Sequence, residues 1–256
     1  MQKKTSNKIS EHAPKAKKPI SEAELGYFLA GLIDGNGHIS KQGYALIVFR
    51  EKDLSVGYYL KKVLNHGNIR KVKNKRAYDF RCTNAQGLYK IEKLIFNKLK
   101  QPKRIKEFNS YLIPRIVCQP MKQNVNSLFK DHWLAGFIQA KGRFQIKILQ
   151  PLVYSPRIVV KIDQKDSVLL RQIRETFGGS ITYNKAQKTY DYNSVSFYNV
   201  VNYINYLDCH QVMGATLTTY WLWRKAFLIV QENKHNERAG AHKLVRLKKS
   251  LTILRN

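Results

Sequence analysis

The spacing of apolar residues near the start of the chain first follows a helical period. Between residues 21 and about 34, apolar side chains recur three or four positions apart, which predicts a helix with one apolar face. Ser21 and Glu24 have the spacing of a capping box, in which each side chain accepts a hydrogen bond from the other residue's backbone N–H. Gly35-Asn36-Gly37 is expected to end this helix.

Alternating apolar and polar positions follow, and they predict strands separated by further helices. Asp53 is placed to cap the helix after the first pair of strands, and His66-Gly67 to end it. In order, the pattern predicts strands at 38–40 and 44–50, a helix at 53–64, strands at 68–72 and 76–82, and a helix at 86–99. Prolines then interrupt the pattern, and we place a linker at 115–127.

The same order of elements returns after the linker, which indicates an internal duplication. Ser127 is expected to cap the first helix of the second copy, and Gly178-Gly179 to end a later one. The second copy has about eight extra residues in its first hairpin, around 150–156. Its pattern predicts helices at 127–139, 166–177, 197–207 and 215–231, and strands at 143–149, 157–162, 180–184 and 189–196. The chain therefore divides into a first repeat, 21–114, and a second repeat, 128–232.

The charge of the chain indicates its class of partner. Across 256 residues, 46 Lys and Arg stand against 17 Asp and Glu, which gives a formal net charge of +29. Self-repulsion of this size is best tolerated when a polyanion neutralises it, so nucleic acid is the expected partner. An anionic membrane surface is the alternative, but no segment approaches the roughly 20 apolar residues that span a bilayer. Residues 1–20 and 233–256 are basic extensions, and we expect the first to be extended and solvated unless something binds it.

Cysteine and histidine usage gives no sign of a metal or disulfide framework. The three cysteines, Cys82, Cys118 and Cys209, are far apart and form no Cys-x-x-Cys pair. The seven histidines show no ligand spacing either. We therefore expect a reducing compartment and no cofactor.

Two predicted strands of the second repeat divide apolar from cationic side chains. The apolar face carries Phe144, Ile146, Ile148, Ile158, Val160 and Ile162, and the other face Arg143, Gln145, Lys147, Arg157, Val159 and Lys161. An apolar back and a cationic front suit a surface that contacts phosphates, whereas an ordinary solvated face is the alternative. The candidate nucleic-acid-binding residues, all basic and on or beside predicted strands, are Lys41, Arg50, Lys52, Arg70, Lys71, Lys73, Lys75, Arg76, Arg81, Arg143, Lys147, Arg157, Lys161, Lys185 and Lys188.

Each repeat begins with a related nine-residue motif. The first, at 29–37, reads Leu-Ala-Gly-Leu-Ile-Asp-Gly-Asn-Gly, and the second, at 134–142, reads Leu-Ala-Gly-Phe-Ile-Gln-Ala-Lys-Gly. The motif resembles the signature of the LAGLIDADG homing endonucleases and maturases, and two copies resemble their single-chain form. The resemblance implies an α+β fold in which two pseudo-symmetric αββαββα repeats form a saddle of antiparallel sheets, with the motif helices at the interface. Gly31 and Gly136 lack side chains, which fits a close approach of two helices.

The eighth motif position departs from the family pattern. There the family carries acidic residues that hold divalent metals, whereas this chain has Asn36 and Lys141. An amide brings no charge to a hard cation, and an ammonium about 4 Å from one costs several kcal/mol. Asp34 points about 200° around the helix, so we expect it to make structural hydrogen bonds, and its counterpart is Gln139. We therefore predict no catalytic residue, no bound metal and no endonuclease activity; a shifted acid such as Asp131 is the alternative.

Three functions are compatible with these residues. We favour a structural RNA-binding protein of an organellar ribosome, in contact with rRNA and ribosomal proteins, because basic extensions can lie between the phosphates of folded RNA. The first alternative is an intron-splicing maturase, since the family contains such proteins. The second is an active homing endonuclease that cuts duplex DNA with Mg²⁺.

The expected partner is RNA rather than duplex DNA, with no membrane partner. No homodimer is needed, because the chain carries both repeats. Abundant Tyr, Asn, Lys and Ile are compatible with an AT-rich organellar genome, so we expect a mitochondrial protein, with the chloroplast as the alternative.

Overall fold

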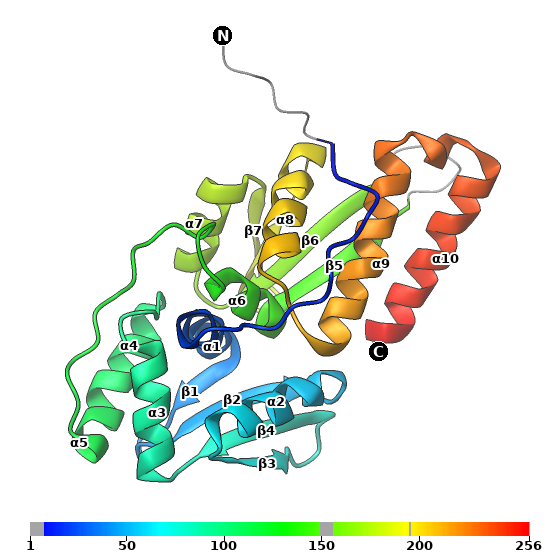
Figure 1. Cartoon of the computed structure of the whole chain (residues 1–256). Coiled ribbons are helices and arrows are strands. Elements are labelled where there is room, and N and C mark those ends of the chain that lie inside the picture. Colours follow the sequence, from blue (N-terminus) through cyan, green and yellow to red (C-terminus); the bar gives the residue numbers. More distant parts are fainter. Residues whose placement is uncertain (1–7, 149–155, 195, 256) are drawn as a thin grey trace. The chain divides into compact units, whose positions relative to one another are not determined.

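The structure is a computed structural model that describes residues 8–148, 156–194 and 196–255 (Figure 1). The chain divides into two compact units. The first unit consists of 17–141 and 210–216, and the second unit of 1–16, 142–209 and 217–256. The extra hairpin residues expected around 150–156 lie outside the described residues, except for Pro156.

The first unit holds one four-stranded antiparallel sheet and both motif helices. Its elements are α1 (Glu22–Asn36), β1 (Gly37–Ile39), β2 (Ala45–Arg50), η1 (Glu51–Asp53), α2 (Leu54–Leu64), β3 (Asn68–Lys71), β4 (Ala77–Cys82), α3 (Ala85–Ile95), α4 (Pro102–Glu107), the π-helical turn η2 (Phe108–Leu112), α5 (Ile113–Ile116) and α6 (Trp133–Lys141). The strand order is β1-β2-β4-β3, and β2 pairs with β4 along its whole length, from Ala45↔Cys82 to Arg50↔Ala77.

The second unit repeats the four-stranded sheet but contains no motif helix. Its elements are β5 (Gly142–Lys147), β6 (Arg157–Gln164), α7 (Val168–Phe177), β7 (Ser180–Asn184), β8 (Thr189–Asn193), α8 (Phe197–Cys209), α9 (Gly214–Gln231) from Leu217 onward, η3 (Lys234–Asn236) and α10 (Arg238–Arg255). The strand order is β5-β6-β8-β7, which matches the order in the first unit. The α+β class and the two four-stranded antiparallel sheets are thus confirmed.

The predicted apolar back of the second sheet is also confirmed. Phe144 packs against the rings of Tyr220 and Trp223 on α9, with centroids 5.5 and 5.1 Å apart. Val160 and Ile162 on β6 are fully buried. One residue of the front face departs from the prediction: Val159 is only 4% exposed. Val159 is therefore a buried apolar residue between the basic residues Arg157 and Lys161 on that face.

The two motif helices, α1 and α6, touch backbone to backbone. A Cβ built on Gly31 would lie 1.9 Å from the Trp133 carbonyl oxygen, and one on Gly136 would lie 2.0 Å from the Phe28 carbonyl oxygen. No side chain fits at either position, so the crossing requires glycine on both helices. This confirms the close approach predicted from the motif.

The ends of the motif helices differ from the sequence prediction. α1 starts with the predicted capping box of Ser21 and Glu24 but continues to Asn36 rather than ending near residue 34. α6 begins at Trp133, so the prediction that Ser127 caps it is wrong. The Asp131 side chain instead accepts a hydrogen bond from the Trp133 backbone N–H at 2.8 Å, which satisfies a free donor at the helix start.

Two further helix predictions need correction. Asp53 precedes α2 but makes no capping hydrogen bond, because its carboxylate is buried and bonds to side chains from distant segments. α3 ends at Ile95 rather than at 99. Asn97 has φ of 52°, in the left-handed region, and this turns the chain away from the helix axis.

The basic C-terminal extension is a folded helix rather than a tail. Leu244, Leu247 and Leu251 recur on one side of α10 and are at most 9% exposed. They belong to the second unit, where α10 lies against β5 and next to α9 (Figure 1). The helical spacing of these leucines drives the folding, because their burial removes apolar surface from water. In the described ranges, no helix is long and apolar enough to cross a bilayer.

The N-terminal extension is extended, as predicted, but residues 8–16 are docked on the second unit rather than solvated. Ile9 is 4% exposed, and its backbone N–H and carbonyl both bond to the Gln231 side chain at 2.8 and 2.9 Å. Arg224 donates to the Ser10 carbonyl at 3.0 Å and forms a bidentate ion pair with Asp208. The chain itself therefore supplies the partner that holds its arm.

Replacing Arg224 with methionine is expected to lower the free energy of unfolding by about 2 kcal/mol. The guanidinium is almost fully buried, so its loss removes the cation paired with the Asp208 carboxylate and the donor to the Ser10 carbonyl. The cost lies below the 3–5 kcal/mol typical of a fully buried pair, because the Asp208 side chain is 20% exposed. Urea denaturation measures this effect, and limited proteolysis is expected to cut residues 8–16 faster. The neighbouring exposed Lys225→Met is the control; equal effects for both variants would contradict the prediction.

Candidate nucleic-acid interface

The C-terminal ends of α1 and α6 bring the two eighth motif positions together. Asn36 is the last residue of α1 and Lys141 the last of α6, and both are half-buried. The Asn36 Nδ2 donates to the Ala140 carbonyl oxygen at 2.9 Å. A Cβ on Gly35 would lie 2.5 Å from the Ala140 Cβ, so the helix ends are in direct contact. The predicted pairing of these positions is therefore present.

The residues at this place do not fit a divalent metal. Asn36 uses its amide as a donor to the neighbouring helix, and Lys141 brings an ammonium rather than a carboxylate. Among the described residues, no group of three or more His, Cys, Asp or Glu is arranged to hold a metal ion. A lysine suits this position for another reason, since the carbonyls at a helix C-terminus carry partial negative charge.

Asp34, at the sixth motif position, holds α1 to two other segments of the first unit. Its carboxylate is fully buried and accepts from the backbone N–H groups of Lys100 and Gln101 at 2.7 and 3.2 Å, and from Trp133 Nε1 at 2.8 Å. Burial raises the pKa of Asp34 to about 6, against the opposing effect of these three donors. The structure thus gives Asp34 the structural hydrogen bonds expected from the sequence.

Gln139 takes the same position in the second motif and has the same kind of role. Its Oε1 accepts from the Met213 backbone N–H at 2.7 Å, and its Nε2 donates to Asp53 Oδ1 at 3.2 Å. Asp53 also accepts from Thr216 Oγ1 at 2.8 Å and pairs with Arg50 at 3.0 Å. In both motifs the sixth side chain therefore fastens the segment that follows the helix after the second hairpin, which is α3 in the first repeat and α8 in the second. An amide can take this position because its Oε1 accepts from the Met213 backbone and its Nε2 has the Asp53 carboxylate as an acceptor.

Asp131 does not replace the missing acids. It precedes α6, whereas Lys141 ends that helix, and ten residues at the helical rise separate them by roughly 15 Å. The Asp131 carboxylate bonds to the Trp133 backbone, and burial raises its pKa. The alternative of a shifted metal-binding acid therefore has no geometric support.

Five of the candidate cations are half-buried, and most of them are already paired. Arg50 binds Asp53, Arg81 lies 3.5 Å from Asp79, and Arg143 binds Asp163 at 2.8 Å. Lys161 bridges Asp163 at 3.3 Å and Asp191 at 2.8 Å. Burial lowers the pKa of Lys161, but the two carboxylates outweigh this and raise it overall, so the ammonium stays charged. Lys52, the fifth, is half-buried in η1.

The other candidates are exposed, and they cluster at the ends and turns of the hairpins. They are Lys41 in the β1–β2 turn; Arg70, Lys71, Lys73, Lys75 and Arg76 around the β3–β4 turn; Lys147 and Arg157 at the ends of β5 and β6; and Lys185 and Lys188 in the β7–β8 turn. None of these ten forms an ion pair in the parts of the chain that the structure describes. The hairpin tips are thus more available to phosphates than the sheet centres.

Sequence reasoning missed the carboxylates at the sheet centres. Asp79 and Asp191 occupy matching positions on β4 and β8, and both are less than 10% exposed. Asp163 lies directly opposite Asp191. The sequence shows that acidic residues occur in these predicted strands. Only the register between the strands shows that they lie beside basic residues.

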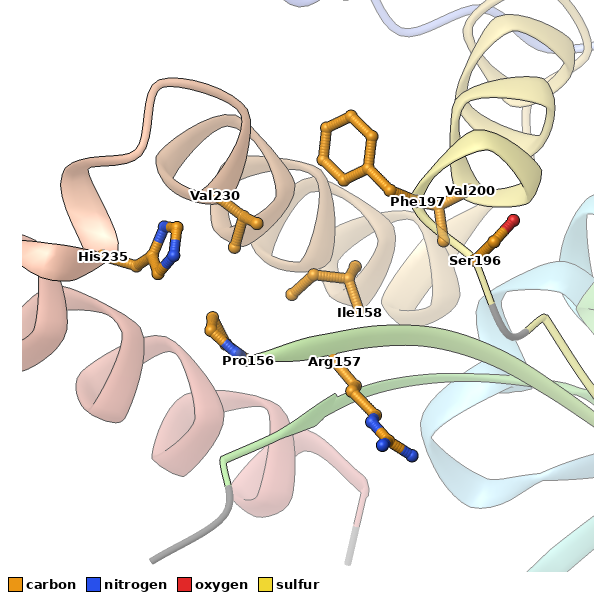
Figure 2. A pocket seen from close by; sticks show the side chains of 8 residues that line it. All are labelled: Pro156, Arg157, Ile158, Ser196, Phe197, Val200, Val230 and His235. Atoms are coloured by element: carbon orange, nitrogen blue, oxygen red, sulfur yellow. The ribbon is translucent and has the colours of Figure 1, made fainter. Parts of the chain in front are cut away.

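A separate hollow in the second unit lies behind the sheet. It has a volume of about 280 Å³. Figure 2 shows its wall: Pro156, Arg157, Ile158, Ser196, Phe197, Val200, Val230 and His235. The Arg157 side chain points away from the hollow, and the wall combines apolar side chains with the polar Ser196 and His235 (Figure 2). It does not extend the cationic surface.

The duplicated sheets and the glycine-paired helices define a two-repeat helix–sheet protein, and comparisons with known proteins agree. Residues 134–227 match the LAGLIDADG endonuclease family. The 37.2 kDa cox1 intron-2 protein of Schizosaccharomyces pombe is 39% identical over 243 residues, covering 92% of this chain and 75% of that protein. The chain belongs to the LAGLIDADG endonuclease family.

More distant matches show the range of that family. The intron-encoded RNA maturase bI4 of Saccharomyces cerevisiae is 26% identical over 174 residues. This match covers 66% of this chain and 27% of the maturase. The solved structure of the meganuclease I-SmaMI bound to uncleavable DNA superposes with a TM-score of 0.70 at 21% identity, covering 88% of this chain and 97% of that one. The last match confirms the fold of a single-chain homing endonuclease.

Proposed function

We propose that this chain binds RNA without cutting nucleic acid. The observation that carries the proposal is the contact between α1 and α6, where the Asn36 amide donates to the Ala140 carbonyl and the ammonium of Lys141 replaces a carboxylate. An acid pair at this point would hold the metals that activate water. With one neutral and one cationic residue, the surface retains its affinity for phosphates and lacks the means of hydrolysis.

The RNA is proposed to be an intron that needs a protein to reach its splicing fold. The similarity to an intron-encoded RNA maturase and to a cox1 intron-2 protein supports this choice. A ribosomal RNA partner, our first expectation from the sequence, is the second candidate, and the two cationic extensions favour it. Both candidates place the protein in mitochondria.

A cleavage assay tests the loss of hydrolysis. Purified protein, Mg²⁺ or Mn²⁺ and a randomised duplex DNA library are expected to yield no double-strand breaks. In the Asn36→Asp/Lys141→Asp variant, two carboxylates meet at the helix ends, so about 10 mM Mg²⁺ is expected to raise the Tm by about 3 °C. The control Asn36→Ala/Lys141→Ala removes the same groups without adding acids, and its Tm should not respond to Mg²⁺. Cutting by the native protein would overturn the proposal.

Cross-linking identifies the RNA. The tagged protein is irradiated in cells, and the attached RNA is sequenced. One intron is the expected product, and deleting the gene should block splicing of that intron. Ribosomal RNA, together with RNase-sensitive sedimentation alongside ribosomal particles, would replace the maturase with the ribosomal role. Absence of attached RNA would remove both.

A further inference from the structure

We propose that the outer face of α10 is a second RNA-binding surface, separate from the two sheets, which holds the phosphate backbone without reading bases. This inference rests on the proposed function only in that the chain binds RNA; it does not depend on whether the chain cuts. We call this face the α10 stripe and define it by the exposed residues Arg238, His242, Arg246 and Lys249.

The α10 stripe follows from the helical period. Leu244, Leu247 and Leu251 lie on one side of α10 and are buried in the second unit. The four stripe residues are spaced four, four and three positions apart, so they form one row on the opposite side. The row is about 16 Å long at the rise of an α-helix. The buried leucines hold the helix, and therefore the row, in a fixed orientation.

All charged residues of α10 are basic. The helix carries no acidic residue, and Lys243 and Lys248 flank the row on either side. In the described part of the chain, none of the basic residues from 238 to 249 forms an ion pair. On the front of the second sheet, by contrast, Arg143 and Lys161 already bind carboxylates. Unpaired cations release the counterions of a polyphosphate without first breaking an existing ion pair, so α10 is a better phosphate site than these paired positions at the centre of the sheet.

A nucleic acid fits this face better than a membrane does. A helix that lies on a lipid surface inserts its apolar side among the acyl chains. In α10 that side is already covered within the second unit. The exposed side has only two large apolar residues, Val245 and Ile253, and they lie on different parts of the helix surface. The side chains presented outward are a fixed row of three cations, Arg238, Arg246 and Lys249, with His242 among them.

The stripe is suited to phosphates rather than bases. Sequence reading needs side chains placed against base edges in a groove, whereas point charges on a convex helix contact the backbone. Binding through α10 should therefore depend strongly on salt and weakly on sequence. Each lost phosphate contact lowers the slope of log K against log salt by about 0.7 for single strands and about 0.9 for duplexes.

The test compares two triple variants with the same loss of charge. Arg238→Gln/Arg246→Gln/Lys249→Gln removes the row and keeps good helix formers. The control Lys93→Gln/Lys103→Gln/Lys106→Gln removes three exposed cations from α3 and α4, which have no proposed contact. Both full-length proteins are titrated by fluorescence anisotropy with a labelled structured RNA, a duplex DNA of equal length, and vesicles of phosphatidylserine and phosphatidylcholine. Circular dichroism confirms that α10 remains folded.

The stripe variant is expected to bind the RNA roughly 10- to 100-fold more weakly in about 0.1 M salt, with a salt slope smaller by about 2. The control should stay within about threefold of the native protein. Equal losses in both variants would overturn the α10 proposal and leave the proposed function standing. A selective loss of vesicle binding would assign the stripe to lipid instead. A native protein that fails to bind RNA would overturn both.

Discussion

Replacing Gly136 with valine is expected to abolish stable folding of the first unit. The new Cβ would fall 2.0 Å from the Phe28 carbonyl oxygen and 2.8 Å from its carbon, both backbone atoms of α1. No rotamer relieves a clash that begins at Cβ, so α1 and α6 would have to separate along their length. The cost is expected to exceed about 4 kcal/mol, which is a large share of the stability of a typical domain. Thermal unfolding and the soluble yield measure it.

Gly57→Ala provides the matched control for this prediction. Gly57 is also a buried glycine within a helix of the first unit, α2. A Cβ there would meet the Ile69 Cδ1 at 3.0 Å, the far end of a side chain on an edge strand that can shift. The free energy of unfolding is expected to change by less than about 1 kcal/mol, because the better helix propensity of alanine offsets the contact. A similar loss in both variants would show that buried helical glycines in general, rather than the helix crossing, set the cost.

Replacing Asp34 with asparagine is expected to destabilise the protein at pH 4 far more than at pH 7. The pKa of Asp34 in the folded protein is about 6, above the ordinary value of 3.8. Between these pH values the folded state keeps a proton that the unfolded state releases, so the stability of the native protein falls as pH rises. A shift of about two units corresponds to roughly 3 kcal/mol. The amide side chain of the variant does not titrate, so the variant does not lose this stability over the interval.

The difference between the two proteins isolates this effect from all other titrating groups. Urea denaturation at pH 4, 5, 6 and 7 gives the cost of Asp34→Asn at each value, and the cost should shrink by about 3 kcal/mol across the series. The exposed Glu22→Gln on the same helix is the control and should cost less than about 0.5 kcal/mol throughout. A cost for Asp34→Asn that grows with pH would reverse the sign and show that the three donors outweigh burial.

Local spacing in the sequence was enough to predict most of the fold. The capping box at Ser21 and Glu24, the paired glycines at 31 and 136, and the order of helices and strands along each repeat all follow from short-range periodicity and the duplicated motif. These features are predictable because each depends on residues a few positions apart, or on a pattern that occurs twice. The replacement of acidic residues by Asn36 and Lys141 was also visible from the sequence, because the two copies of the motif can be aligned position by position.

The parts that could not be predicted depend on contacts between distant segments. Asp53 has the position of a helix cap, but Thr216, 163 residues later, takes its carboxylate. Gln139 looked like a lost acid, and its bond to the Met213 backbone N–H shows that an amide serves there. The C-terminal residues were identified from the sequence only as a basic extension, because the charge of α10 obscured its buried leucines. In each case the deciding partner comes from another part of the sequence.

The docked arm cannot bind until the residues that hold it have been synthesised. The Gln231 amide that holds the backbone of Ile9 is synthesised 222 residues later than Ile9 itself. At about 5–20 residues per second, the arm waits roughly 10–45 s without its binding site. The arm therefore reaches its final place only after the end of α9 has been made, and until then its contacts with Gln231 and Arg224 are absent.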